Sequence, residues 1–208
     1  MSIKLMMCGR RRPGQTRRDN QHHMKHVHGS LVLNYIATDP DNAPRVYVQN
    51  HTIDSTFANG DASPKAFALG FDFITEVSFP DLASAKASRE TAYYLERLMP
   101  DEPRMVDTDN VLGLPFAETE IQPASITDNA IKLFVVMAKD AVTPQDTINA
   151  ARATLPETLG YSRNVALMLG PIAQLMCSAS RMPTAPTPLQ RPIKRACRQI
   201  LMNKRHSW

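Results

Sequence analysis

The first 30 residues combine a short apolar run with a longer polar and amphipathic stretch. Ile3 to Cys8 is an apolar run that predicts a buried strand, and Arg12-Pro-Gly14 predicts the turn after it. Thr16, with Asp19 three residues later, predicts a helix start with a capping-box-like pair. Gly29 predicts the end of that helix, where a left-handed residue is common.

The next segments complete one structural unit. Arg45 to His51 and Phe71 to Phe79 are rich in β-forming residues and predict two strands, with a polar loop over Asp54 to Pro64 between them. Asp81 predicts a helix that runs to about Leu98, and Arg104 to Leu112 predicts a fourth strand. The order is βαββαβ, a ferredoxin-like unit whose sheet has one face covered by helices.

The opening pattern recurs in the second half of the chain. Ile3-Lys-Leu is repeated as Ile131-Lys-Leu133, which leads into another apolar run, Phe134 to Met137. Thr143-Pro-Gln-Asp146 repeats the helix-start signal. Two such units can pack their bare sheet faces together, so we expect an α+β protein of the dimeric α+β-barrel type.

The second copy is predicted to be incomplete. Ser162 to Leu169 and Ile172 to Ala179 are expected strands, Arg181 to Gln190 is proline-rich and irregular, and Pro192 to Asn203 predicts a basic amphipathic helix. With no final strand, one sheet edge stays open. We therefore expect a homodimer with two-fold symmetry, in which the tail helix covers part of the gap.

Three domains follow from these boundaries. They are a ferredoxin-like domain at 1–121, a degenerate second ferredoxin-like repeat at 122–180 and a basic, proline-rich tail with a possible helix at 181–208. The tail is either a specialised interaction element or an anomaly of the coding sequence, because residues 158–208 contain no Asp or Glu.

Charge is distributed unevenly along the chain. Residues 1–28 carry +6 and residues 158–208 carry +8, so the rest carries −10 within a net charge of +4. A basic patch attracts nucleic acid or acidic ligands, but few aromatic residues adjoin these segments to stack on bases. We prefer solvated charge to a nucleic-acid partner.

The expected compartment is the cytoplasm. No apolar run approaches the roughly 20 residues that span a bilayer, so no membrane partner is expected. The apolar stretch Leu5 to Cys8 is short and is followed by arginines, unlike a signal peptide. Cys8, Cys177 and Cys197 form no CxxC pair, which favours free thiols.

Four of the six histidines lie between Gln21 and Gly29. On an α-helix, His22 and His26 share a face, as do His23 and His26. His28 is placed at the predicted helix end, where the dipole favours a cation. Imidazole both donates and accepts protons near neutral pH, so we select His28 as the catalytic acid/base.

Two other interpretations of the cluster remain open. One is a solvated helix with incidental histidines. The other is a metal site, although no acidic or cysteine ligand adjoins the cluster and the HExxH pattern is absent.

The second predicted strand alternates polar residues on one face: Arg45, Tyr47, Gln49 and His51. If this face lines a pocket, Tyr47 is a second catalytic residue that orients a substrate oxygen together with Gln49, and Arg45 holds a carboxylate or enolate. His23 and His51 are further substrate-binding candidates. The alternative is that this face is packed or solvated.

In this order, these segments resemble the EthD family. The opening strand, basic turn and helix that ends in His28-Gly look like the start of that family, and Arg45 to His51 is similar to its second strand. Phe71 to Phe79 and Met99 to Asp107 match its third strand and late acidic turn. The resemblance covers about residues 1–120 well, 130–170 weakly and the tail not at all.

Two departures from the family pattern affect the expected site. Asn20 and Met24 stand where such helices usually carry aromatic residues, so the pocket wall is expected to differ. The second repeat has Ala150 to Thr154 in place of histidines, so the site is expected in the first half.

The resemblance implies a small-molecule enzyme. EthD proteins are associated with ether breakdown, and the wider superfamily includes oxygenases, cyclases, decarboxylases and isomerases, many of which use no metal or organic cofactor. We therefore expect acid/base chemistry on a hydrophobic aromatic, polyketide-like or ether-derived intermediate, without a cofactor, as an oxidoreductase or lyase. The alternative is a non-catalytic ligand-binding or accessory protein of a catabolic or biosynthetic pathway, because a fold does not fix a reaction.

Overall fold

The protein is described by a computed structural model, which covers residues 2–52, 71–123, 130–138, 158–168, 172–181 and 197–204. These residues form two compact units. The first contains the described residues up to His51 together with Phe71–Ala117, and the second contains Thr52 and the described residues from Glu118 onward.

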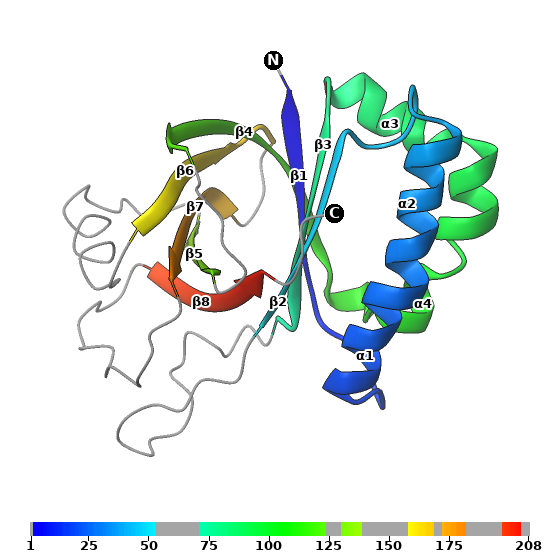
Figure 1. The fold of residues 1–208 in the computed structure, drawn as a ribbon, viewed down its shortest axis with the longest axis horizontal. Helices are drawn as coiled ribbons and strands as arrows, with labels where there is room; N and C mark the ends of the chain where they lie inside the picture. Colours follow the sequence, from blue (N-terminus) through cyan, green and yellow to red (C-terminus); the bar gives the residue numbers. More distant parts are fainter. Residues whose placement is uncertain are drawn as a thin grey trace. The chain divides into compact units, whose positions relative to one another are not determined.

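The first unit has the predicted βαββαβ order (Figure 1). Its antiparallel sheet has the strand order β4-β1-β3-β2. The strands are β1 (Ile3–Gly9), β2 (Val46–Thr52), β3 (Phe73–Phe79) and β4 (Leu112–Gln122), of which Thr52 and the part of β4 from Glu118 are counted with the second unit. The first crossover contains α1 (Arg17–His23), the π-helical turn η1 (Met24–His28) and α2 (Gly29–Thr38). The second contains α3 (Leu82–Glu90), the π-helical turn η3 (Tyr94–Leu98), α4 (Glu102–Met105) and the 3₁₀ turn η4 (Thr108–Asn110).

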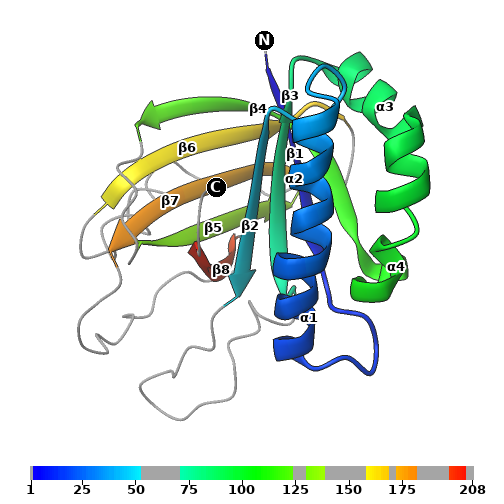
Figure 2. The same cartoon turned by 45° about the vertical axis from the view of Figure 1, so that its right-hand side comes forward.

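The helices of the first unit lie on one face of its sheet (Figure 2). Side chains of successive strand residues point to opposite faces, so alternate residues of the sheet meet the helices. Val77 and Phe79 of β3 pack with Ile3 and with Ala85 of α3. Tyr47 of β2 contacts both this cluster and a second one built on the helices.

The two crossovers are joined through Tyr35 of α2. Its ring stacks on Tyr93 with 4.9 Å between centroids and 5° between planes. Its hydroxyl donates to the Ser88 carbonyl at 3.1 Å and lies 2.9 Å from Thr91 Oγ1. Tyr35 is 1 % exposed, so this polar group is satisfied inside the core, which fixes α2 against α3.

The other face of the first sheet carries a buried polar group. Lys4 Nζ lies 3.1 Å from Glu76 Oε2, and Asn50 Nδ2 donates to Glu76 Oε1 at 2.8 Å. Cys8 is also buried, at 2 % exposure. Burial and the negative charge of Glu76 raise the pKa of the Cys8 thiol to about 12.

The second unit contains a four-stranded antiparallel sheet. Its strand order is β8-β5-β7-β6, which repeats by position the order of the first sheet. Its strands are β5 (Ala130–Ala138), β6 (Thr158–Ala166), β7 (Ile172–Arg181) and β8 (Cys197–Lys204). The helix predicted from Thr143 and the loop predicted over Asp54 to Pro64 lie outside the described residues.

The predicted tail helix over Pro192 to Asn203 is wrong from Cys197 onward, and its first residues lie outside the described part of the chain. Cys197–Lys204 forms β8, which pairs along β5 from Met137↔Cys197 to Ile131↔Asn203. A short apolar run fits either periodicity, and here backbone pairing with β5 decides the conformation. The second sheet therefore has, among the described residues, the fourth strand that it was predicted to lack, and the missing strand no longer serves as the reason to predict a homodimer. The dimer itself stays a prediction.

Three further boundaries differ from the prediction. Gly29 does not end the first helix, because its backbone is right-handed (φ −58°) and α2 continues from it, so His28 lies inside the helix and not at its dipole end. The second helix is broken after α3, where Thr91 is extended. The fourth strand begins at Leu112, because α4 and η4 occupy most of the span predicted for it.

Two local signals are confirmed. Thr16 caps α1 by accepting a hydrogen bond from the Asp19 backbone N–H at 3.1 Å. Gly14 has φ +82°, a conformation that favours glycine, in the predicted turn. Among the described residues, none of the helices is long and apolar enough to cross a membrane.

We predict that Cys8 resists thiol reagents in the folded protein. Since only the thiolate reacts, a pKa near 12 makes labelling at pH 8 roughly a thousandfold slower than that of a free cysteine. Peptide mass mapping after iodoacetamide treatment measures this, with guanidinium-unfolded protein as the control. Rapid modification of Cys8 in the folded protein would contradict the burial of this thiol.

Candidate active site

The π-helical turn η1 brings two histidines onto one face of the first helix. The Gly29 N–H donates to the Met24 carbonyl, five residues back. In an α-helix, residues five apart lie about 140° apart around the axis. A π turn accommodates one more residue, so His23 and His28 face the same side.

Asp101 lies between these two histidines. Its Oδ1 is 2.9 Å from His23 Nε2, and its Oδ2 is 3.1 Å from His28 Nδ1. Asp101 is 4 % exposed. Burial raises the pKa of the Asp101 carboxyl, but the hydrogen bonds and charges of His28 and His23 outweigh burial, so the net shift of the pKa is downward. Asp101 is therefore a carboxylate at neutral pH.

The carboxylate fixes the tautomer of His28. Since a carboxylate only accepts hydrogen bonds, the proton of neutral His28 must be on Nδ1, which leaves the lone pair on Nε2. The same reasoning places the proton of His23 on Nε2. An Asp–His pair of this kind orients a base and stabilises the imidazolium that forms when the base accepts a proton.

A second π turn positions Asp101. The Met99 N–H donates to the Tyr94 carbonyl at 2.8 Å, which closes η3. The Asp101 N–H then donates to Leu98 O at 3.0 Å, and its own carbonyl accepts from the Arg104 N–H at 3.0 Å. The carboxylate is thus anchored on ordered backbone between η3 and α4.

Gln49 connects strand β2 to the first π turn. Its Nε2 donates to the Met24 carbonyl at 2.6 Å and to the Tyr47 hydroxyl oxygen at 2.5 Å. A Cβ atom at Gly29 would come within 3.0 Å of the same Met24 carbonyl, so glycine leaves room for this junction. Tyr47 accepts from Gln49, which leaves its own O–H free to donate elsewhere.

Tyr47 remains protonated at neutral pH. Burial raises the pKa of its phenol, the hydrogen bond from Gln49 opposes this, and the negative charge of Asp101 raises the pKa further. A buried, protonated phenol can donate a hydrogen bond to a negatively charged oxygen.

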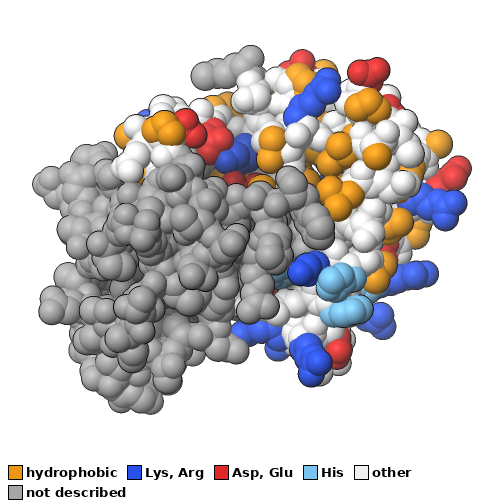
Figure 3. All heavy atoms as spheres, in the orientation of Figure 1, with side chains coloured by type: hydrophobic (Ala, Val, Ile, Leu, Met, Phe, Trp, Pro, Cys, Tyr) orange, Lys and Arg blue, Asp and Glu red, His pale blue; other side chains and the backbone are white. Residues whose placement is uncertain are grey.

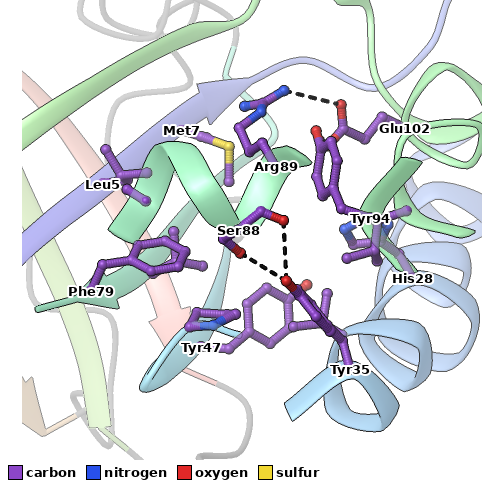
Figure 4. A pocket seen from close by; sticks show the side chains of 15 residues that line it. Leu5, Met7, His28, Tyr35, Tyr47, Phe79, Ser88, Arg89, Tyr94 and Glu102 are labelled. Carbon is purple, nitrogen blue, oxygen red and sulfur yellow. Dashed lines mark hydrogen bonds and ion pairs between the residues drawn. The ribbon is translucent and has the colours of Figure 1, made fainter. Parts of the chain in front are cut away.

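His28 and Tyr47 line one pocket between the sheet and the helices (Figure 4). The pocket has a volume of about 80 Å³. Its apolar walls include residues of β1, β3 and both crossovers, among them Leu5, Met7, Val77, Phe79, Val32 and Leu98.

The polar side chains at the edge of the pocket form a connected group. Tyr94 donates to Glu102 Oε1 at 2.7 Å, and Arg89 Nη2 lies 4.0 Å from Glu102 Oε2. Burial, and then the hydrogen bond to Glu102, raise the pKa of Tyr94. The Arg89 side chain is 57 % exposed, so the pocket reaches solvent at this residue.

The other predicted site residues lie away from this pocket. Arg45 is exposed just before β2, and His51 Nε2 is 3.3 Å from Gln49 Oε1. His22 and His26 are exposed, with 4.9 Å between ring centroids. Figure 3 shows histidine side chains at the surface beside Lys and Arg. In the described part of the chain, no three His, Cys, Asp or Glu side chains are placed to hold a metal ion.

The two residues that depart from the family pattern, Asn20 and Met24, face the interior. Asn20 Nδ2 donates to the Met105 carbonyl at 2.7 Å, and Met24 packs in a cluster with Phe73 and Met105. Neither is among the residues that line the pocket.

Asp101 was missed as a site residue in the sequence. Its signal was the acidic turn Met99 to Asp107, which was recognised only as a family feature. Arg89, Tyr94 and Glu102 were also missed. Arg89 and Tyr94 fall within the helix predicted from Asp81 to about Leu98, and Glu102 lies in the acidic turn after it, where no site residue was expected.

Residues 12–109 match the EthD domain. This match spans both crossovers, and so includes His23, His28, Tyr47 and Asp101.

Two solved structures are similar to the chain. The first, from Lactobacillus acidophilus NCFM, is named "putative monooxygenase"; it is 10 % identical with a TM-score of 0.51, over 86 % of this chain and 76 % of that one. The second is an anthrone oxidase-like protein, 10 % identical with a TM-score of 0.50, over 99 % and 91 %. At such identities the likeness shows the fold alone. The predicted class, α+β with ferredoxin-like units of the dimeric α+β-barrel kind, is confirmed.

We predict that Asp101→Asn destabilises the EthD-like unit in a pH-dependent manner. The folded pKa of Asp101 lies below its unfolded value of about 3.9, so its stabilisation is present above about pH 4 and is lost as the pH falls through the folded value. We expect a loss of about 2 kcal/mol in the free energy of unfolding at pH 7, because a buried carboxylate loses charged hydrogen bonds. The loss should shrink below pH 4.

Urea denaturation at several pH values measures this effect. Asp109→Asn is the matched control, because Asp109 is exposed. An equal loss for Asp101→Asn at pH 7 and pH 3 would show that the carboxylate charge is not what stabilises the site.

Proposed function

We propose that this chain is a small-molecule enzyme that removes a proton from a hydrophobic, aromatic or polyketide-like substrate, with His28 as the base. The observation that carries the proposal is the orientation of His28. Its Nδ1 is committed to Asp101, so its basic Nε2 remains available on a side chain that lines the pocket.

Tyr47 supplies the second part of the chemistry. When His28 takes a proton from a carbon next to a carbonyl group, the C–H electron pair forms a C=C bond and the π pair of the carbonyl moves onto its oxygen, which gives an enolate. The protonated phenol of Tyr47 lines the same pocket and can donate a hydrogen bond to that oxygen. Asp101 offsets the positive charge gained by His28.

The pocket supports a partly inserted aromatic substrate. A cavity of about 150 Å³ holds a benzene molecule, so a pocket of about 80 Å³ receives the reacting edge of a ring while the rest extends past Arg89. The enolate can be reprotonated, can expel a leaving group as in a lyase, or can pass electrons to an acceptor such as dioxygen as in an oxidoreductase. Proton removal is common to all three.

The proposed proton removal can be followed without knowing the natural substrate. We suggest 1-tetralone, 2-tetralone and anthrone as enolisable ketones fused to aromatic rings, incubated with the protein in deuterated buffer under nitrogen. Proton NMR then measures the replacement of the acidic C–H hydrogens by deuterium. We expect exchange well above the buffer rate for at least one of these ketones.

His28→Gln should lower the exchange rate by about 10²- to 10⁴-fold, the usual contribution of a general base. Tyr47→Phe should lower it by about 10²-fold through loss of a donor to the enolate oxygen. His26→Gln is the matched control, because His26 is exposed on the same helix. Binding of these ketones with no exchange above buffer would instead support the alternative, a ligand-binding or accessory protein.

A further inference from the structure

His23 holds the oxygen of Asp101 that His28 does not use. The His23 side chain is 19 % exposed and that of His28 is 12 % exposed, but only His28 is among the residues that line the pocket. A direct role for His23 in contacting substrate is therefore not what its position favours. Its ring instead binds Asp101 Oδ1, on the side of the carboxylate that does not contact His28.

We propose that His23 is a positioning residue, which locks the Asp101 carboxylate in the orientation that keeps His28 in its Nδ1–H tautomer. The inference rests on the proposed function only in that His28 is the base. The positioning itself follows from the hydrogen bonds at 2.9 Å and 3.1 Å.

The physical reason lies in the burial of the carboxylate. Both oxygens of a buried carboxylate need donors, because an unpaired charged oxygen is costly out of water. Among the described residues, the two imidazoles are the donors to the Asp101 side chain. If His23 is lost, Oδ1 has no donor, so the carboxylate can rotate toward water, which weakens its hydrogen bond with His28 Nδ1.

Rotation of the carboxylate matters because His28 has two neutral tautomers. Only the Nδ1–H tautomer, held by Asp101, leaves Nε2 as the proton acceptor. In the other tautomer Nε2 carries the proton and cannot serve as the base. His23 thus acts on the reaction through Asp101 and without touching the substrate.

Three variants separate this role from a general effect on folding. His23→Gln keeps an amide N–H that can reach Asp101, whereas His23→Ala removes the donor. His26→Gln is the matched control, since His26 lies three residues away on the exposed side of the same helix. If His23→Ala does not fold, His23→Leu takes its place, because leucine removes the donor and leaves less empty volume.

The first measurement is the tautomer of His28. Nitrogen-15 NMR of labelled protein at pH 8 distinguishes a protonated from an unprotonated ring nitrogen. We expect His28 to be in the Nδ1–H form in the unmodified chain, in His23→Gln and in His26→Gln, and to be a mixture of both forms in His23→Ala. Unchanged His28 signals in a folded His23→Ala would overturn the proposal, as would the mixture in His23→Gln.

The second measurement is turnover in the ketone exchange assay. We expect His23→Ala to lower kcat about tenfold with little change in KM, and His23→Gln to restore most of the loss. If no variant and no unmodified chain exchanges any ketone, the proposed function fails while the NMR result still tests the positioning. Normal kcat in His23→Ala would refute the positioning role alone.

Discussion

The arrangement of the site depends on a helix turn that holds one residue more than an α-helix. His23 and His28 are five residues apart, and only the π-helical winding of η1 lets both reach one carboxylate. The same turn places the Met24 carbonyl where Gln49 can donate to it, and Gln49 in turn donates to the Tyr47 hydroxyl oxygen. One irregular turn therefore fixes the position of the base, His28, and, through Gln49 of strand β2, the position of the Tyr47 phenol.

The second crossover also contains a π-helical turn next to a site residue. Its own π turn, η3, precedes Asp101, and the aromatic stack of Tyr35 on Tyr93 holds the two crossovers together. The pocket is bounded by the apolar face of the sheet on one side and by these helices on the other. Because the same face of the sheet forms both the core and the pocket wall, a change in helix packing will also change the shape of the site.

The fold was predictable from the sequence where local signals and packing agree. The strands predicted from the apolar runs of β1, β3 and β5 are confirmed, as is the Thr16 cap of α1. At these positions the local preference of the residues and their packing favour the same conformation. The tail was predicted wrongly, because pairing with β5 outweighs a helical pattern in a short run. His28 and Tyr47, the catalytic candidates from the sequence, both line the pocket. Asp101, which binds His23 and His28, was missed, since α-helical periodicity pairs His23 with His26 and says nothing about contacts across 78 residues.

The winding of η1 also has a meaning for the comparison of related chains. A chain with one residue fewer between His23 and His28 could form an unbroken α-helix, in which these histidines would be four apart and would still share a face. The π turn thus absorbs an insertion without displacing either imidazole. A one-residue gap at this point of an alignment would therefore mark a change in how the helix is wound, while the two histidines and the carboxylate between them remain equivalent.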